Sequence, residues 1–184
     1  MWKSYNRFYT QIIKSEAGSI YQCRNVNQIP SVKRVSISCV SNNPNSVKST
    51  LMTLSALQLV FDKKAKIVTS RDSVVLTKVR KGQPLGAKVF LTKGSAWQFL
   101  NFLTFNLMPQ LDLTKKIYFS KRNSDFKFII KSSAVFNVLK LFFNFFQFLP
   151  SIQVVFGFKN PPINDKPFFW RLLKLPVASS KKDF

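Results

Sequence analysis

The sequence predicts an α+β fold, in which helices cover one face of an antiparallel sheet within a single domain of residues 1–184. The chain has 184 residues, and 46% of them are apolar, which is enough to bury one core. Apolar and polar residues alternate over residues 32–40, as in a strand with one wet face. Helical and strand-like segments follow in the order helix, strand, helix, strand, strand, helix, which is typical of α+β proteins.

The first 20 residues predict an amphipathic helix. Apolar residues recur there every three or four positions, at Trp2, Tyr5, Phe8 or Tyr9, and Ile12. The segment lacks a continuous apolar run and a small-residue cleavage site, so we expect no cleavable signal peptide. Its cations leave a transit peptide as the alternative, although Glu16 is unusual for one.

The next segments predict a strand, a helix and two short strands. In residues 32–40, Val35, Ile37 and Cys39 alternate with polar neighbours that include Arg34. Residues 42–46 are predicted to turn and to cap a helix. The expected apolar stripe of that helix is Val47, Leu51, Leu54, Leu57 and Phe61. Residues 66–69 and 87–92 predict strands on either side of a basic loop.

The second half predicts a helix from Ser95 that Pro109 stops or kinks, and then a basic loop leading into a strand within residues 115–131. Residues 135–149 are rich in phenylalanine. A membrane span needs about 20 apolar residues, whereas this run is shorter and contains Lys140, so it predicts a buried helix. Residues 152–158 predict a last core strand and residues 168–175 a short closing helix.

The charge of the chain points to a polyanionic partner. The formal net charge is +22 with an isoelectric point near 10.4, so a free protein of this kind would repel itself. Between Asp62 and Lys93 there are nine Lys or Arg residues against two Asp. The basic excess extends over the entire chain, which favours nucleic acid over an ordinary solvated face.

The composition argues against enzymatic and metal chemistry. There is no histidine, and Cys23 and Cys39 have no metal-ligand partners at a usual spacing. Seven scattered acids supply no general acid and base pair, so the chain is predicted to be no enzyme and to need no cofactor or metal. Cys39 is expected to be a buried thiol in a reducing or neutral compartment.

A sharply defined turn is predicted at Gly82, Pro84 and Gly86. Glycine permits backbone angles closed to other residues, and proline fixes one torsion between the two glycines. The cations beside this turn would therefore point in a set direction, as a phosphate-binding loop requires.

Three blocks of the sequence resemble the family of ribosomal large-subunit protein five, the uL5 family. The central block has the order T-K-x-R-x-S followed by K-x-R-x-G-x-P-x-G-x-K-V-x-L. The chain matches it at Arg71, Ser73, Lys78, Val79, Arg80, Gly82, Pro84, Leu85, Gly86, Lys88, Val89 and Leu91. Residues 25–35 resemble the N-V-x-Q-V-P-x-V-x-K-I entry to the family's first strand. Trp97, Phe99, Leu103 and Pro109 match the helix that follows the central block.

The resemblance implies a uL5-type domain that is best matched over residues 25–111, with a divergent second half in residues 112–184. It implies a divergent, mitochondrial-type ribosomal protein in the central protuberance of the large subunit. Its partners would be large-subunit rRNA, 5S rRNA where one is present, P-site tRNA, and neighbouring proteins of the protuberance and of the small-subunit head. It also implies an initial helix in residues 1–20.

The cations and one hydroxyl group that we expect on rRNA lie in the first half of the chain. These residues are Lys33, Arg34, Lys63, Lys64, Lys66, Arg71, Ser73, Lys88 and Lys93. The resemblance implies that the loop of residues 71–81 faces tRNA, through Arg71, Lys78, Arg80 and Lys81. Trp97 and Phe99 are expected in the core and not in a base-stacking platform.

The chain departs from the family pattern at several positions. It has residues 38–40 where the family has an Asn-x-Gly, Lys63 and Lys64 within the family's G-Q-K/R-P, and Phe90 and Thr92 in place of V-T-L-R. Such drift, together with high charge and abundant phenylalanine, favours a mitochondrial ribosome in the matrix. The alternatives are an organellar RNA-binding accessory factor for splicing or processing, and a membrane protein that rests on residues 135–149 alone.

Overall fold

The computed structural model describes residues 6–41, 46–73, 79–110, 118–119, 126–131, 135–160, 169 and 172–173. In chain order, its helical elements are η1 (Tyr9–Ile13), α2 (Lys14–Ile20), η2 (Val26–Gln28), α3 (Val47–Phe61), α4 (Gly94–Phe102), η3 (Leu103–Leu107), α5 (Met108–Gln110), α6 (Asn137–Leu141) and α7 (Phe143–Phe146). The strands are β1 (Ser31–Val40), β2 (Lys66–Thr69), β3 (Pro84–Thr92), β4 (Tyr118–Phe119), β5 (Phe126–Ile130) and β6 (Ile152–Lys159).

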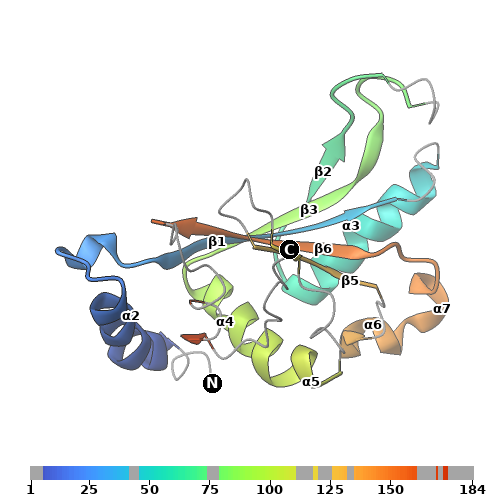
Figure 1. Cartoon of the computed structure of the whole chain (residues 1–184). Coiled ribbons are helices and arrows are strands. Elements are labelled where there is room, and N and C mark those ends of the chain that lie inside the picture. Colours follow the sequence, from blue (N-terminus) through green and yellow to red (C-terminus); the bar gives the residue numbers. More distant parts are fainter. Residues whose placement is uncertain are drawn as a thin grey trace, which may run out of the picture. The chain divides into compact units, whose positions relative to one another are not determined.

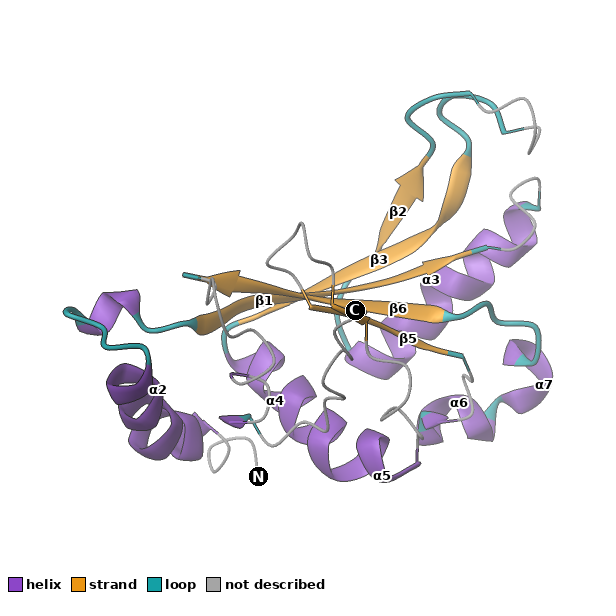
Figure 2. Ribbon diagram, viewed as in Figure 1, coloured by secondary structure: helices purple, strands orange, loops and turns teal. Residues whose placement is uncertain are grey.

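The strands form a six-stranded sheet in the order β2-β3-β1-β6-β5-β4, shown as orange arrows in Figure 2. The pairs β2 with β3 and β4 with β5 are antiparallel. The predicted α+β class with an antiparallel sheet is therefore confirmed.

The chain divides into two compact units. Unit 1 comprises Met1–Val35, Leu91–Phe128 and Val155–Phe184, and unit 2 comprises Ser36–Phe90 and Ile129–Val154. Strands β1, β3, β5 and β6 each continue from one unit into the other. That residues 1–184 act as one domain stays a prediction.

Aromatic rings hold the core of unit 1. Phe156 of β6 is buried, and its ring centroid lies 6.2 Å from that of Phe99 in α4 and 6.0 Å from that of Phe128 in β5. Tyr9 lies 4.5 Å from Trp97, which attaches η1 to α4. The predicted core position of Phe99 is confirmed, since its ring is buried against that of Phe156. Trp97 is half-buried and packs against Tyr9, so it belongs to the margin of this core.

The N-terminal helix buries a different face from the one predicted. Tyr9, Ile13 and Ala17 are buried at a spacing of four, whereas Ile12 is 46% exposed. The Tyr9 hydroxyl donates a 2.7 Å hydrogen bond to the carbonyl oxygen of Pro30, which satisfies its polar group inside the core. Residues 1–5, with Trp2 and Tyr5, lie outside the described residues.

In unit 2, helices α3, α6 and α7 lie on the same side of the unit's strands (Figure 1). Helix α3 begins as predicted, since the Ser46 side chain accepts a hydrogen bond from the Ser49 amide. It ends at Asp62, which has left-handed backbone angles. The residues before the cap, 42–45, are not among the described ones.

The predicted apolar stripe of α3 is wrong at its first half. Val47 is 64% exposed and Leu51 is 56% exposed, whereas Thr50, Thr53, Ala56 and Leu57 are buried. Threonine can enter this core because its hydroxyl donates to a carbonyl oxygen of its own helix, from Thr50 to Val47 and from Thr53 to Thr50, each at 2.8 Å. Because threonine was counted as a polar residue, the apolar stripe of α3 was predicted on the wrong helix face in this half.

The predicted buried helix at residues 135–149 is also wrong. The segment forms two short helices, α6 and α7, separated at Phe142, whose backbone is not helical. Phe136, Leu139 and Phe146 are buried, but the exposed side chains include Leu141 and Phe148, each 81% exposed. Asn and Phe have modest helix propensity, so composition alone did not sustain one helix here.

The last elements follow the prediction closely where they are described. Strand β6 extends the expected strand by one residue. Of the predicted closing helix, Phe169 and Leu173 are buried, and the Leu173 amide donates to the Phe169 carbonyl as in a helical turn. Most of the predicted basic loop before β5 lies outside the described residues, apart from β4.

Candidate nucleic-acid interface

In the β2–β3 hairpin of unit 2, hydrogen bonds hold together the two chain segments from which the loop starts. The Ser70 amide donates to the Gln83 carbonyl at 2.9 Å, and the Gly82 amide donates to the Ser70 carbonyl at 3.0 Å. The side-chain oxygen of Gln83 accepts from the Arg80 amide at 2.9 Å. Gly82 has a φ of 81°, which glycine adopts without strain. The loop of residues 71–81 therefore starts and ends at hydrogen-bonded positions.

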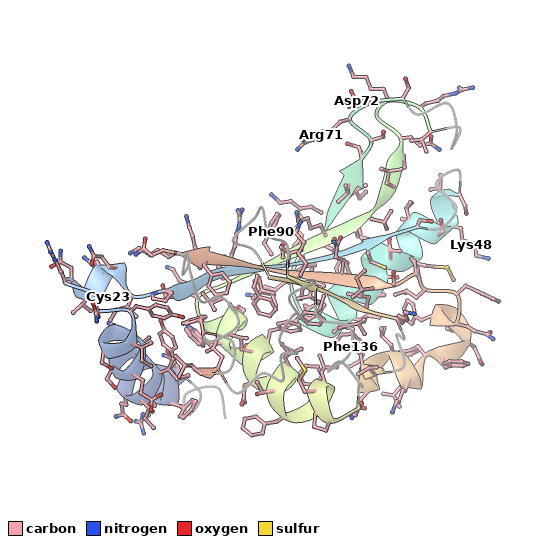
Figure 3. The ribbon with its side chains drawn as sticks, viewed as in Figure 1. Cys23, Lys48, Arg71, Asp72, Phe90 and Phe136 are labelled. Carbon is pink, nitrogen blue, oxygen red and sulfur yellow. The ribbon has the colours of Figure 1, made fainter. Side chains whose placement is uncertain are left out.

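Three of the four cations expected in this loop are described, and all three are exposed: Arg71, Arg80 and Lys81. Arg71 and Asp72 lie at the far end of the hairpin (Figure 3), and the Ser70 hydroxyl donates to the Asp72 carbonyl. Ser73 is exposed too. Lys78 and the apolar residues 74–76 lie outside the described part of the loop.

A second group of cations lies where the chain enters and follows the hairpin strands. Lys63 and Lys64 are exposed between α3 and β2. Lys66 is paired across the antiparallel strands with Lys88, so both side chains project from the same face. Unit 2 thus brings together Lys63, Lys64, Lys66, Arg71, Ser73, Arg80, Lys81 and Lys88, as a phosphate-binding surface requires.

The other predicted site residues belong to unit 1. Lys33 and Arg34 are exposed in β1, and Arg34 extends along β6, where a Cβ added to Gly157 would come 3.2 Å from its Cγ. Lys93 is exposed at the start of α4, and its carbonyl oxygen accepts from the Ala96 amide.

Sequence reasoning missed three residues of the exposed strand faces. The half-buried Lys127 of β5 and the exposed Lys159 of β6 lie one and three residues from the buried Phe128 and Phe156. An odd spacing puts them on the opposite strand face, so alternation could have identified them. Phe90 of β3 is 42% exposed, and the Lys88 ammonium lies 4.8 Å from its ring centroid. Because Phe90 stands between apolar residues in the sequence, the sequence pattern did not predict that its ring is exposed.

The predicted turn is narrower than expected. Only Gly82 lies in it, because Pro84 and Gly86 belong to β3. Among the described glycines only Gly82 has a positive φ, so Gly86 is not needed for its backbone angles. A Cβ at Gly86 would instead fall on the Cys39 carbonyl oxygen and 2.9 Å from the Val40 Cα. Gly86 therefore lets β1 approach β3 closely.

The thiol of Cys39 is buried, as predicted. It is fully shielded from solvent and donates a 3.4 Å hydrogen bond to the Pro150 carbonyl oxygen. Burial raises the pKa of this thiol to about 12. Cys39 is thus a structural residue of unit 2 and has no nucleophilic role at neutral pH.

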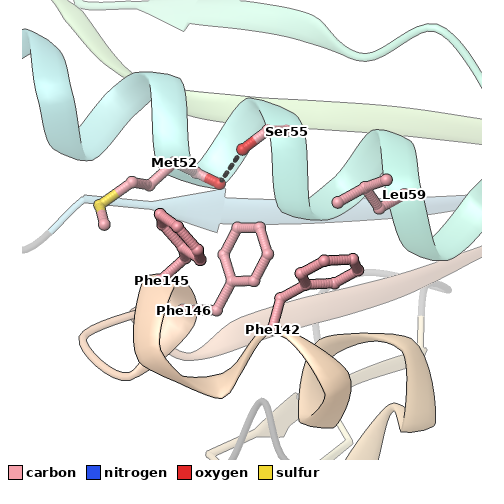
Figure 4. A pocket seen from close by; sticks show the side chains of 6 residues that line it. All are labelled: Met52, Ser55, Leu59, Phe142, Phe145 and Phe146. Atoms are coloured by element: carbon pink, nitrogen blue, oxygen red, sulfur yellow. Dashed lines mark hydrogen bonds between the residues drawn. The ribbon is translucent and has the colours of Figure 1, made fainter.

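An apolar hollow of about 240 Å³ lies between α3 and α7 in unit 2 (Figure 4). It is lined by Met52, Ser55, Leu59, Phe142, Phe145 and Phe146. The Ser55 hydroxyl donates to the Met52 carbonyl oxygen at 3.0 Å, so it offers a ligand little polar contact. The hollow resembles no catalytic site.

Two searches of the described residues gave negative results. No helix among them has the length and apolarity that crossing a bilayer would demand. Nor do they contain a group of three or more His, Cys, Asp or Glu side chains able to hold a metal ion.

The chain was compared with protein-family models and with curated proteins. No protein-family model matches the chain. The chain is 25% identical over 108 residues to large ribosomal subunit protein uL5 of Lawsonia intracellularis, covering 57% of this chain and 59% of the relative. It is 30% identical over 104 residues to large ribosomal subunit protein uL5 of Nocardia farcinica, covering 56% of each. The matched region therefore spans somewhat over half the length of these curated relatives.

Proposed function

Because the chain is a divergent member of the uL5 family of large-subunit ribosomal proteins, we propose that it is a structural constituent of the large ribosomal subunit. In this role it binds rRNA in the central protuberance, including 5S rRNA where one is present. It has neighbouring ribosomal proteins of the protuberance and of the small-subunit head as further partners. It acts without catalysis, as a basic scaffold that neutralises and positions RNA phosphates.

The single observation that carries rRNA binding is the collection of exposed cations on the β2–β3 hairpin. Lys63, Lys64 and Arg71 are exposed around it, while the described acids of unit 2 are Asp62 and Asp72. Antiparallel pairing of Lys66 with Lys88 puts two lysine side chains on the same face of neighbouring strands. Such an arrangement repels itself unless a polyanion lies over it.

A matched pair of double variants tests this role of the hairpin. We expect Lys63→Ala with Lys64→Ala to weaken binding to large-subunit rRNA and to reduce the slope of log K against log salt by about 2. The control is Lys48→Ala with Lys140→Ala, which removes the same charge from exposed positions of α3 and α6 in the same unit. Filter binding over a salt series measures both. Equal losses in the two double variants would reduce the proposed site to general charge attraction.

We further propose that the loop of residues 71–81 contacts P-site tRNA, through Arg71, Lys78, Arg80 and Lys81. The support is the resemblance of this loop to the family's tRNA-facing loop. In addition, Arg71, Arg80 and Lys81 are exposed, and the two ends of the loop are joined by hydrogen bonds. Arg71→Ala with Arg80→Ala should leave subunit assembly nearly intact and weaken tRNA retention, increasingly as salt rises. Failed assembly with normal tRNA affinity would instead put this loop on rRNA.

The proposed location is the mitochondrial matrix, within the mitochondrial ribosome. High charge, abundant phenylalanine and departures from the family pattern support it, whereas the two relatives named above are bacterial. Purified mitochondria should yield the chain in the large-subunit fraction of a sucrose gradient, released only by high salt. Recovery with intron-containing RNA particles would favour an accessory factor for splicing, and retention in stripped membranes would favour a membrane protein.

A further inference from the structure

Phe90 is an exposed aromatic residue of β3. It lies two residues beyond Lys88, where the pairing of β3 with β2 ends. Its neighbours Val89 and Leu91 are buried on the opposite strand face, whereas the Phe90 side chain is 42% exposed (Figure 3). The core therefore does not require an aromatic ring here, and the family pattern V-T-L-R has threonine at this position.

The surroundings of the ring are cationic. The Lys88 ammonium lies 4.8 Å from the ring centroid, a distance at which a cation is attracted to the ring face. Lys66 is directly opposite Lys88 in the β2–β3 register, and Lys63 and Lys64 precede β2. A partner that covers this ring must also accept several positive charges.

Strand β1 is the other neighbour of β3. The two strands are held together at one end of β3, where the Ser41 amide donates to the Leu85 carbonyl at 2.8 Å and the Cys39 backbone lies against Gly86. In β1, Ser36 and Ser38 alternate with the buried Val35, Ile37 and Cys39 and are partly exposed. The exposed face of β1 in unit 2 therefore carries two small polar side chains, which leave room for a planar group.

We propose that Phe90 stacks on an unpaired RNA base while Lys66 and Lys88 contact the phosphates beside it. This inference rests on the proposed function, and it adds a single-stranded segment to the rRNA that the chain binds. Every base has a face that can stack on an aromatic ring, and flanking cations follow its backbone, as in known single-strand binding sheets. An apolar protein surface would instead leave these lysines without anionic partners.

The test uses the full-length chain with two probes: a fluorescent single-stranded RNA 12-mer and a duplex RNA of the same length. Loss of one stacked base costs about 5- to 150-fold in affinity, so Phe90→Leu should weaken single-strand binding by that factor and change duplex binding little. Phe90→Trp should keep wild-type affinity. Phe105→Leu, which alters a 70% exposed ring on η3, is the matched control and should change neither.

A second readout is photocrosslinking of 4-thiouridine placed along the single-stranded probe, with the crosslinked peptide identified by mass spectrometry. Crosslinks to the β3 peptide that disappear in Phe90→Leu support stacking. Equal affinity of Phe90→Leu and wild type for the single strand overturns the proposal, and so does an equal loss for single strand and duplex. If wild type binds neither probe in a salt-dependent manner, the proposed rRNA binding itself fails.

Discussion

The two units of this protein differ at their most tightly packed points. In unit 1 these are large rings, such as Phe156 between Phe99 and Phe128. Unit 2 also buries rings, such as Phe136, but its closest approach joins two backbones, at Gly86 against Cys39. Unit 1 should therefore be most sensitive to atoms that are removed, and unit 2 to atoms that are added.

The largest effect is expected from Gly86→Ala, which should lower the free energy of unfolding by roughly 4 kcal/mol or more. The new Cβ would meet the Cys39 carbonyl oxygen, and a backbone atom in a strand cannot rotate away. Urea unfolding measures the loss. The control Gly18→Ala adds the same atom within α2, where its nearest neighbour is 3.5 Å away, and should stabilise by about 0.5 kcal/mol. Similar stabilities for both variants would refute close packing in unit 2.

Phe156→Ala should cost about 3 to 4 kcal/mol, because the two neighbouring rings cannot fill the cavity it leaves. Its side chain is fully buried, whereas that of Phe105 is 70% exposed. Phe105→Ala should consequently change the denaturation midpoint little. If both substitutions cost the same, large rings are not what holds unit 1 together.

Alkaline pH should destabilise both units, because each buries one weakly acidic side chain: the Tyr9 hydroxyl in unit 1 and the Cys39 thiol in unit 2. Burial raises the pKa of Cys39 from 9.0 and of Tyr9 from 10.0, each to about 12. The folded chain therefore holds these protons more tightly than the unfolded chain. The stability they contribute is full below about pH 9 and is lost as pH rises to 12, by at most about 1.4 kcal/mol per pH unit for each group.

Denaturant unfolding at several alkaline pH values gives this slope. Cys39→Ala removes one titrating group and should flatten the slope, most clearly near pH 9, where only about a tenth of the Tyr9 hydroxyl is deprotonated in the unfolded chain. An unchanged slope in that variant would mean that the thiol titrates equally in both states.

Gly82→Ala should have the smallest effect, a loss of about 1 kcal/mol. Its φ of 81° disfavours a side chain, but an added Cβ would have no neighbour within 4 Å. Gly82→Asn should recover most of the loss, since asparagine tolerates left-handed angles. A loss as large as that of Gly86→Ala would show that the turn, and not close packing, dominates this region.

The strands were the most predictable part of the fold. Residues 66–69 were predicted without error and β1 within one residue, because alternation reports a two-sided environment directly. Helix faces were less predictable. The buried hydroxyls of Thr50 and Thr53 are satisfied within α3, and sequence patterns that treat threonine as polar cannot anticipate this.

The candidate site was predictable in its charges and not in its arrangement. Lys63, Lys64 and Arg71 are exposed, as phosphate contacts must be, although their contacts with RNA stay predictions. The role of Gly86 depends on β1, which is distant in sequence, and the exposure of Phe90 depends on which strand face the helices cover. Neither property can be read from local spacing.

The strand order limits how early this protein can fold during its own synthesis. Strand β6 lies between β1 and β5, and the Cys39 thiol reaches Pro150, 111 residues later in the chain. Until β6 has emerged, the nascent chain carries one unpaired edge of β1, which can pair with a strand of another chain. Folding must therefore wait for a late segment, and polypeptides truncated before residue 152 should aggregate during synthesis.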